Sequence, residues 1–124
     1  MTWNIIFHPD FEHEFDNLER PVQDAIYARL ILLQREGPNL GRPHADTLNG
    51  STYANMKELR CQVSGQHWRL AFAFDPEQKC VLLCAGSKSG VKSNRFYKTM
   101  NRIADRRFAD HLSAGEGEKD EHDT

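Results

Sequence analysis

Residues 55–86 decide the fold, and they read NMKELRCQVSGQHWRLAFAFDPEQKCVLLCAG. Three apolar runs of strand length are separated by two short polar segments, residues 64–66 and 75–78. Runs of this length joined by short turns are typical of antiparallel strands that follow one another in a sheet. The segment therefore predicts a meander of three strands.

The first two predicted strands have one apolar and one polar face, because side chains alternate along a strand. The apolar face carries Leu59, Cys61, Val63, Trp68, Leu70, Phe72 and Phe74. The opposite face carries Glu58, Arg60, Gln62, His67, Arg69, Ala71 and Ala73. The third strand is apolar throughout, as expected where both sides are covered. Two interpretations of the polar face stay open: it is solvated, or its small alanines leave room for something above them.

The residues before the meander predict a strand and a helical hairpin. A short apolar run at residues 3–7 indicates an N-terminal strand. Pro9 and Pro21 are each suited to open a helix, and Gly37 to end the second one. Apolar residues recur at helical spacing in both segments, so we expect the hairpin to cover the apolar face of the sheet.

Two connecting segments and a last helix complete the predicted fold. Residues 39–54 predict a long loop, in which His44 is a minor candidate for function. Residues 87–94 form a Gly/Ser/Lys-rich segment that could contact phosphate. Asn94 is suited to cap a third helix that reaches Leu112. Its exposed side is predicted to carry Arg95, Lys98, Arg102, Arg106 and Arg107.

These elements predict an α+β fold: a small antiparallel sheet, made of the N-terminal strand and the meander, backed by a helical hairpin and followed by a C-terminal helix. At 124 residues the chain is long enough for one domain, which we place at residues 1–112. Residues 113–124 are polar and rich in acids, and they predict a disordered acidic tail.

The composition excludes several classes of protein. No apolar run approaches the roughly 20 residues that span a bilayer, and the first residues lack the pattern of a signal peptide, so we expect a cytoplasmic protein without membrane contact. Three cysteines fall inside predicted strands, which favours buried free thiols over disulfides. No cysteine or histidine pair has the spacing of metal ligands, so we expect neither a metal site nor a cofactor.

The net charge of −2 conceals a segregation along the chain. Residues 1–54 have a balance of −4 and residues 108–124 a balance of −5. Residues 55–107 carry eleven Lys and Arg against four acids, a balance of +7. The basic charge thus lies on the meander and the helix after it, which favours a polyanionic partner.

Four short stretches together resemble the RelE/HigB superfamily of bacterial toxins, and most closely its phage-derived HigB-like branch. They are Met56-Lys-Glu-Leu-Arg60, Trp68-Arg-Leu-Ala-Phe72, Leu82-Leu-Cys-Ala-Gly-Ser-Lys88 and Phe96-Tyr-Lys98. The resemblance covers about residues 3–112, and it rests on the order and spacing of the four stretches. It implies a RelE-like fold with a concave basic face.

The resemblance also implies a function. The expected protein is the toxin of a type II toxin–antitoxin module, an mRNA interferase that cleaves translated mRNA at the ribosome without a metal ion. A cognate HigA-like antitoxin with a helix-turn-helix part would silence it, and would provide its only link to DNA. Two alternatives stay open: a non-catalytic inhibitor of DNA gyrase, as in the ParE branch, and a plain RNA-binding module.

The resemblance assigns roles to individual residues of the polar face. Arg60 and Arg69 would hold the scissile phosphate, since a guanidinium matches phosphate oxygens two at a time. Lys88 would add a charge from the loop. Glu58 stands where related toxins often have a lysine, and is either the general base or an ion-pair partner of the arginines. Tyr97 would stack on a base or transfer a proton, or else pack on the sheet.

The remaining candidates are expected to contact RNA more generally. They are Lys57, His67, Lys92, Arg95 and Lys98. His67 could also act as an acid or a base, although a histidine next to a turn can equally be an exposed spectator. The lysines and arginines of the last helix could instead form a solvated face. The other histidines, among them His8 and His111, are expected to have no role.

Overall fold

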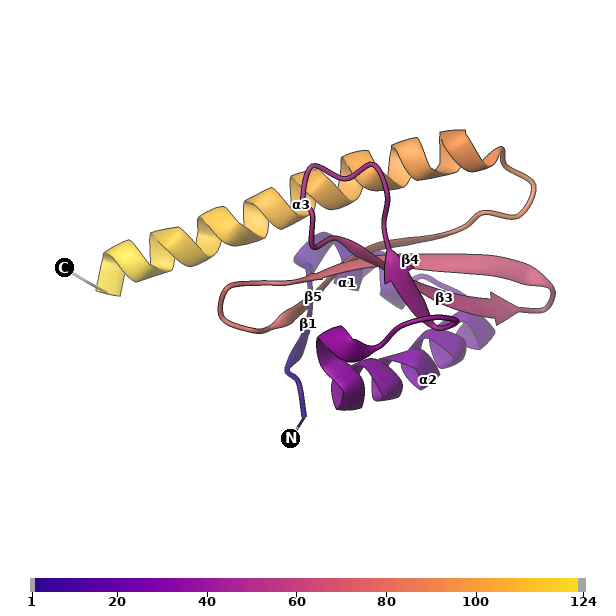
Figure 1. Cartoon of the computed structure of the whole chain (residues 1–124), viewed down its shortest axis with the longest axis horizontal. Coiled ribbons are helices and arrows are strands. Elements are labelled where there is room, and N and C mark those ends of the chain that lie inside the picture. The colour runs from indigo at the N-terminus through magenta and orange to yellow at the C-terminus, as the bar shows by residue number, and fades with distance from the viewer. Residues whose placement is uncertain (1, 123–124) are drawn as a thin grey trace.

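The computed structural model describes the backbone of residues 2–122 and the side chains of residues 2–115. Its elements are β1 (Ile5–Phe7), α1 (Pro9–Asp16), α2 (Arg20–Glu36), the 3-10 turn η1 (Gly37–Asn39), β2 (Ala45–Thr47), β3 (Lys57–Val63), β4 (Gln66–Phe74), β5 (Cys80–Ser87) and α3 (Ser93–His122). The strands form one sheet in the order β1-β5-β4-β3-β2. Helices α1 and α2 cover one face of the sheet, and α3 crosses the other (Figure 1).

The predicted α+β fold is confirmed, including the meander β3-β4-β5, with two corrections to the sheet. β1 pairs with β5 in parallel, so the sheet is mixed rather than wholly antiparallel. The predicted loop at residues 39–54 contains β2, which pairs antiparallel with β3. The two corrections have different causes. The partner and direction of β1 depend on which strand edge is free in the folded sheet, and β2 has only three residues, of which Ala45 alone is apolar, so no apolar run indicated it.

The helical hairpin closes the larger of two apolar cores. Phe11 and Phe15 of α1 and Ile26 and Leu33 of α2 are almost fully buried, and they pack against the apolar face of β3 and β4. Proline stands in the first turn of both helices, as predicted. Gly37 ends α2 with a positive φ of 60°, a conformation that favours glycine.

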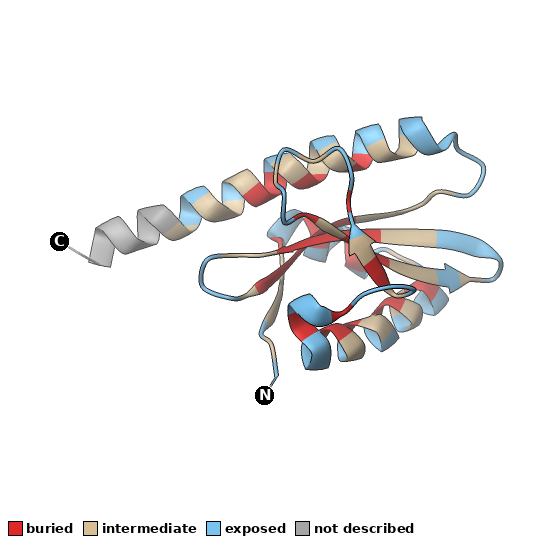
Figure 2. Cartoon of the chain, in the orientation of Figure 1, coloured by how far each residue is buried: buried red, intermediate tan, exposed pale blue. Residues whose placement is uncertain are grey.

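The second core lies under α3. It shows that the polar face of the meander is covered above its two alanines rather than solvated there. Ala71 and Ala73 have no exposed surface, and they belong to one buried cluster with Met100 and Ala104 of α3. Small side chains on the strand allow a helix to approach closely. Helix α3 therefore covers the part of this face that carries the two alanines, whereas the parts of β3 and β4 that carry Arg60 and Arg69 are only partly buried (Figure 2).

Arg107 lies inside this second contact, so the prediction that it is exposed is wrong. Its side chain is buried, and its guanidinium donates to both carboxylate oxygens of Glu14, at 2.8 and 2.6 Å, and to the carbonyl of Leu83 at 2.8 Å. The cause is the position of Arg107 two helical turns after Met100, on the stripe that faces the sheet. The ion pair joins α3 to α1 across the end of the sheet.

Two histidines that were expected to have no role make structural contacts. The ring of His8 accepts a hydrogen bond from the backbone N–H of Asp10 and caps α1, and its burial lowers its pKa. The ring of His111 lies 2.8 Å from the carboxylate of Asp75, which connects α3 to the turn between β4 and β5.

Helix α3 extends beyond Leu112, where it was predicted to end. Its backbone is helical to His122, so the segment expected to be disordered begins as a continuation of the helix. A formed helix adds further residues at little cost, which explains the difference. The side chains from residue 116 onward, with most of the predicted acidic tail, lie outside the described residues. Among the residues described, no helix is long and apolar enough to cross a membrane.

Candidate RNA-binding site

The register of β3 and β4 brings the two predicted arginines together. Arg60 lies directly opposite Arg69, and Glu58 lies opposite Ala71, all on the face toward α3. The side chain of Arg69 is 12% exposed and that of Arg60 is 35% exposed, so both border on solvent. Two guanidinium groups on neighbouring strands would repel each other unless a negative charge lay between them.

Glu58 provides that negative charge. Its side chain is only 4% exposed, and its Oε1 accepts hydrogen bonds from Arg60 Nε at 3.0 Å and from the Tyr97 hydroxyl at 3.1 Å. Arg69 Nε lies 3.5 Å from the same oxygen and donates to the Tyr97 hydroxyl at 3.3 Å. The carboxylate therefore holds two arginines and a tyrosine from three elements in a fixed arrangement.

Strand β2 adds a second carboxylate that sequence analysis left without a role. Asp46 Oδ2 accepts from Arg42 at 2.8 Å and from Arg60 at 3.4 Å, while Oδ1 accepts from the backbone of Thr47. The hydrogen bond from Arg42 lowers the pKa of Asp46, and the hydrogen bond to Glu58 raises the pKa of Arg60. Asp46 is thus an anion and Arg60 a cation at neutral pH.

Tyr97 is positioned by the first turns of α3, where it closes the site opposite the strands. The Nζ of Lys88 lies 5.4 Å from the centre of its ring, within the range of a cation–π contact. Burial raises the pKa of the Tyr97 hydroxyl, so this group keeps its proton at neutral pH. It can therefore donate a hydrogen bond, as it does here to Glu58.

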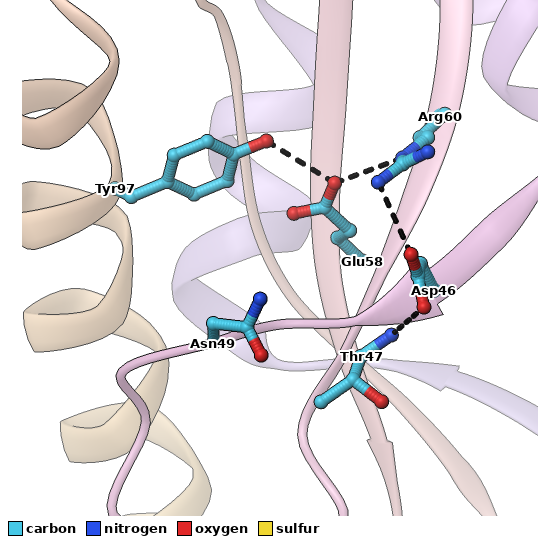
Figure 3. A pocket seen from close by; sticks show the side chains of 6 residues that line it. All are labelled: Asp46, Thr47, Asn49, Glu58, Arg60 and Tyr97. Atoms are coloured by element: carbon cyan, nitrogen blue, oxygen red, sulfur yellow. Dashed lines mark hydrogen bonds and ion pairs between the residues drawn. The ribbon is translucent and has the colours of Figure 1, made fainter.

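Two adjacent pockets share Arg60. The first has a volume of about 320 Å³ and is lined by Asp46, Thr47, Asn49, Glu58, Arg60 and Tyr97 (Figure 3). The second has a volume of about 200 Å³ and is lined by Arg29, Pro43, Arg60, Cys61, Gln62, His67 and Arg69. The first contains both carboxylates, whereas the lining of the second contains three arginines, a histidine and no carboxylate.

The structure brings together Glu58, Arg60, Arg69, Lys88 and Tyr97, and it places His67 at their edge. His67 lies next to Lys88, because the backbone N–H of Lys88 donates to the carbonyl of His67 at 2.8 Å. In the described residues, no three His, Cys, Asp or Glu side chains are grouped so as to hold a metal ion.

The other predicted RNA contacts do not line either pocket. Lys57 points to the opposite face of the sheet, where its Nζ donates to the carbonyl of Pro38 at 2.8 Å. Lys92, Arg95 and Lys98 are exposed around the start of α3. Arg95 lines a separate, mainly apolar pocket between α3 and the end of β5.

Sequence reasoning gave no role to several residues that line or support the two pockets, and the four most relevant are Arg29, Arg42, Asp46 and Asn49. Arg29 comes from α2, and its Nε donates to the carbonyl of Arg60 at 3.1 Å. The other three belong to the segment predicted as a plain loop. Of these residues only Asp46 could have been suspected from the sequence, because it is an acid in an unusually long connecting segment and such segments are often functional.

Comparison with known proteins identifies relatives. Residues 13–109 match the family described as phage-derived protein Gp49-like. HigB2 of Mycobacterium tuberculosis, named as a toxin, is 39% identical over 105 residues, which cover 84% of this chain and 52% of HigB2. HigB3 of the same organism, also named as a toxin, is 40% identical over 113 residues, covering 91% of this chain and 96% of HigB3. The chain thus spans about half of one relative and nearly all of the other.

A solved structure supports the fold. A mutant of the E. coli toxin RelE in the free state superposes with a TM-score of 0.58 at 17% sequence identity. The match covers 83% of this chain and 99% of that one. This likeness establishes a shared RelE-like fold.

Proposed function

The chain belongs to the phage-derived Gp49-like family of the HigB/RelE type, and on that premise we propose that it is the toxin of a toxin–antitoxin module. Its activity would be that of an endoribonuclease that cuts mRNA during translation, without a metal ion, and so arrests growth. Because ribosomes carry its substrate, the protein would act in the cytoplasm.

One observation carries this proposal: Arg60 and Arg69 lie opposite each other and border on a pocket that has no carboxylate in its lining. A phosphate in that pocket would meet both guanidinium groups, and Arg29 and His67 line the same pocket. Cations placed where negative charge develops are an effective way to accelerate phosphoryl transfer. Lys88, held over the Tyr97 ring, would add positive charge nearby.

Cleavage requires two proton transfers on opposite sides of the phosphate. The ribose 2′-oxygen attacks phosphorus while a base takes its proton, and the bond to the 5′-oxygen breaks while an acid protonates that oxygen. We assign the acid to Tyr97, whose hydroxyl is protonated. We assign the base to His67. Tyr97 lines the first pocket and His67 lines the second, and the two pockets share Arg60, so the two residues would lie on different sides of a phosphate held there.

Glu58 is assigned a positioning role rather than that of the base. Its Oε1 already accepts from Arg60 and Tyr97 and pairs with Arg69, so a proton placed there would weaken the arrangement of the arginines. This arrangement also accounts for a glutamate where related toxins often have a lysine. A lysine would add a third cation next to the two arginines, whereas the glutamate offsets them.

The proposed regulator is a cognate antitoxin of the HigA-like type, with a helix-turn-helix part that binds DNA. Such a partner would silence the toxin by covering the arginines or by displacing an element that positions them. α3 is the element whose displacement would do most, since it supplies Tyr97. The toxin itself would contact mRNA and the ribosome, and DNA only through the antitoxin.

The test is to map 5′ ends of cellular mRNA after brief induction of the wild-type protein, Arg69→Ala and Arg35→Ala. Arg35 is an exposed arginine on α2, and it serves as the matched control. We expect new ends inside translated frames with the wild type and Arg35→Ala. Loss of one charge-stabilising donor typically costs about 10²–10³-fold in rate, so Arg69→Ala should produce almost none.

Two results would contradict the proposal. Intact messages in cells that stop growing, with DNA damage, would favour a gyrase inhibitor of the ParE type. Cleavage by a folded Arg69→Ala variant at the wild-type rate would show that the arginine pair is not the site. Circular dichroism of each variant verifies that the fold is retained.

A further inference from the structure

We propose that the pocket of Figure 3 binds a nucleobase of the RNA, and that it selects a base with an amino group over uracil. This inference rests on the proposed function in taking the ligand to be RNA. It goes further by assigning the two pockets to different parts of a nucleotide.

The charges of the two pockets separate their ligands. The first pocket contains the carboxylates of Asp46 and Glu58, which would repel a phosphate. The second has a cationic lining, and Arg60 stands between the two. A nucleotide whose phosphate contacts Arg60 from the second pocket would thus present its neutral part, the base, to the first. A volume of about 320 Å³ lies at the lower end of the range for small-molecule sites, which suits a single base.

The second oxygen of Glu58 is the strongest evidence for a ligand here. The Glu58 side chain is only 4% exposed, yet no described residue donates a hydrogen bond to its Oε2. Figure 3 shows this oxygen directed into the space between Tyr97 and Asn49. This oxygen is not one of the fully buried polar atoms that lack a partner, so it reaches solvent through the pocket. A ligand that displaces the solvent there must offer a donor in its place, since an unpaired carboxylate oxygen is costly once it is desolvated. A bound N–H group would supply the missing donor.

Two further groups of the pocket define which donor fits. Asp46, on the far side of Arg60, is held as an anion by Arg42, so it too can only accept hydrogen bonds. The backbone carbonyl of Asn49 accepts from Asn101, and its side-chain amide also lines the pocket. The pocket therefore offers carboxylate acceptors beside an amide that can donate and accept.

This arrangement matches bases that carry an exocyclic amino group. Adenine, guanine and cytosine each present such N–H donors beside an acceptor, and Glu or Asp side chains accept from the amino group of cytosine in other complexes. Uracil presents a carbonyl oxygen where cytosine has the amino group, and this oxygen would face a carboxylate without a proton between them. The one N–H of uracil on this edge, at N3, lies between two carbonyl oxygens. The ring of Tyr97 provides a surface on which the base could stack.

The test compares two nucleotides of equal size that differ only along one edge of the base. Cytidine and uridine monophosphate share the sugar, the phosphate and a pyrimidine ring of the same size. They differ at position 4, an amino group in cytosine and a carbonyl in uracil, and at N3, which accepts in cytosine and carries a hydrogen in uracil. Each is titrated into the purified full chain, and its affinity is measured by calorimetry or NMR. We expect cytidine monophosphate to bind roughly tenfold or more tightly, since a well-placed base contact discriminates by about 1–3 kcal/mol.

Variants locate the preference in the pocket. Glu58→Gln should abolish it, because an amide can donate to the uracil carbonyl as readily as it accepts. Asn39→Ala, which changes an exposed asparagine of the turn η1, is the matched control and should keep it. Equal binding of the two nucleotides by the wild type, no binding of either, or an unchanged preference in Glu58→Gln would each overturn the inference.

The failure of this inference can be told apart from the failure of the proposed function, because binding needs no cleavage. Messages that are cut in cells, together with equal affinity for the two nucleotides, would keep the nuclease and remove the base pocket. A preference for cytidine monophosphate, together with intact messages, would keep the base pocket and remove the nuclease.

Discussion

The ion pair between Arg107 and Glu14 should hold α3 on the sheet, and its removal should lower stability in a pH-dependent way. Arg107 is 6% exposed, and its guanidinium donates three hydrogen bonds, two of them to Glu14. Glu14→Gln removes the negative charge while it keeps the size of the side chain. It leaves a buried cation with the Leu83 carbonyl and with Asp10, whose carboxylate lies 3.9 Å away.

The size of the expected loss in unfolding free energy follows from the hydrogen bonds of the pair and from the exposure of Glu14. Hydrogen bonds that involve a charged group are worth about 1.5–3 kcal/mol each. The Glu14 side chain is 50% exposed, so solvent screens the pair and the lower end applies. We expect Glu14→Gln to lower the free energy of unfolding by about 1–2 kcal/mol at pH 7. For a chain of this size, that corresponds to a fall in Tm of roughly 3–10 °C.

The same pair predicts a pH dependence of known sign. The hydrogen bond from Arg107 lowers the pKa of Glu14 in the folded state below its value of about 4.3 in the unfolded chain. The stabilisation is therefore fully present above that unfolded value, and it is lost as the pH falls through the folded pKa. The difference between wild type and Glu14→Gln should shrink below about pH 4.

Urea unfolding followed by circular dichroism at pH 7 and at pH values down to 3.5 measures both effects. Glu12→Gln is the matched control, because Glu12 is exposed on the same helix and has no ion pair with any described residue. Equal stability of the two variants at pH 7 would refute the reasoning. A Glu14→Gln effect that stays constant down to pH 3.5 would refute its electrostatic origin.

Three further predictions concern the site, the helix end and the cysteines. Tyr97→Phe removes the proposed acid but keeps the ring, so it should slow cleavage by about 10²-fold or more while RNA affinity changes little, as measured by single-turnover cleavage on ribosomes and by filter binding. Gly37→Ala should destabilise by about 1–2 kcal/mol in thermal unfolding, because an alanine would need a positive φ and its methyl group would collide with Trp3. Burial raises the pKa of Cys80, and that of Cys84 to about 12, so neither thiol should react with a thiol reagent at pH 8 until the protein unfolds.

The sequence predicted the elements of the fold well, because strands and helices leave local periodic signals. The alternation along β3 and β4 placed Leu59 and Phe72 in one core and Arg60 and Arg69 on the other face. Prolines located the starts of α1 and α2. The parallel pairing of β1 and the existence of β2 were missed, since each depends on an edge that forms only after the meander has folded.

Sequence reasoning named several side chains that the structure brings together, but not how they are arranged. The polar face and the opening of the last helix supplied Glu58, Arg60, Arg69 and Tyr97. The contacts among these side chains could not be derived from the sequence. Whether Glu58 is a base or an ion-pair partner of the arginines therefore stayed open. The structure shows its Oε1 shared among three side chains, one of them 39 positions away in the chain.

The sequence by itself determined which side chains face each side of the sheet and where positive charge accumulates, because both properties depend on neighbours along the chain. Only the tertiary structure decided that α3 covers Ala71 and Ala73, that Asp46 joins the arginines, and that Arg107 is buried against Glu14, which lies 93 positions away. These outcomes depend on pairing and packing between distant segments, and periodicity along the chain does not encode which segments meet.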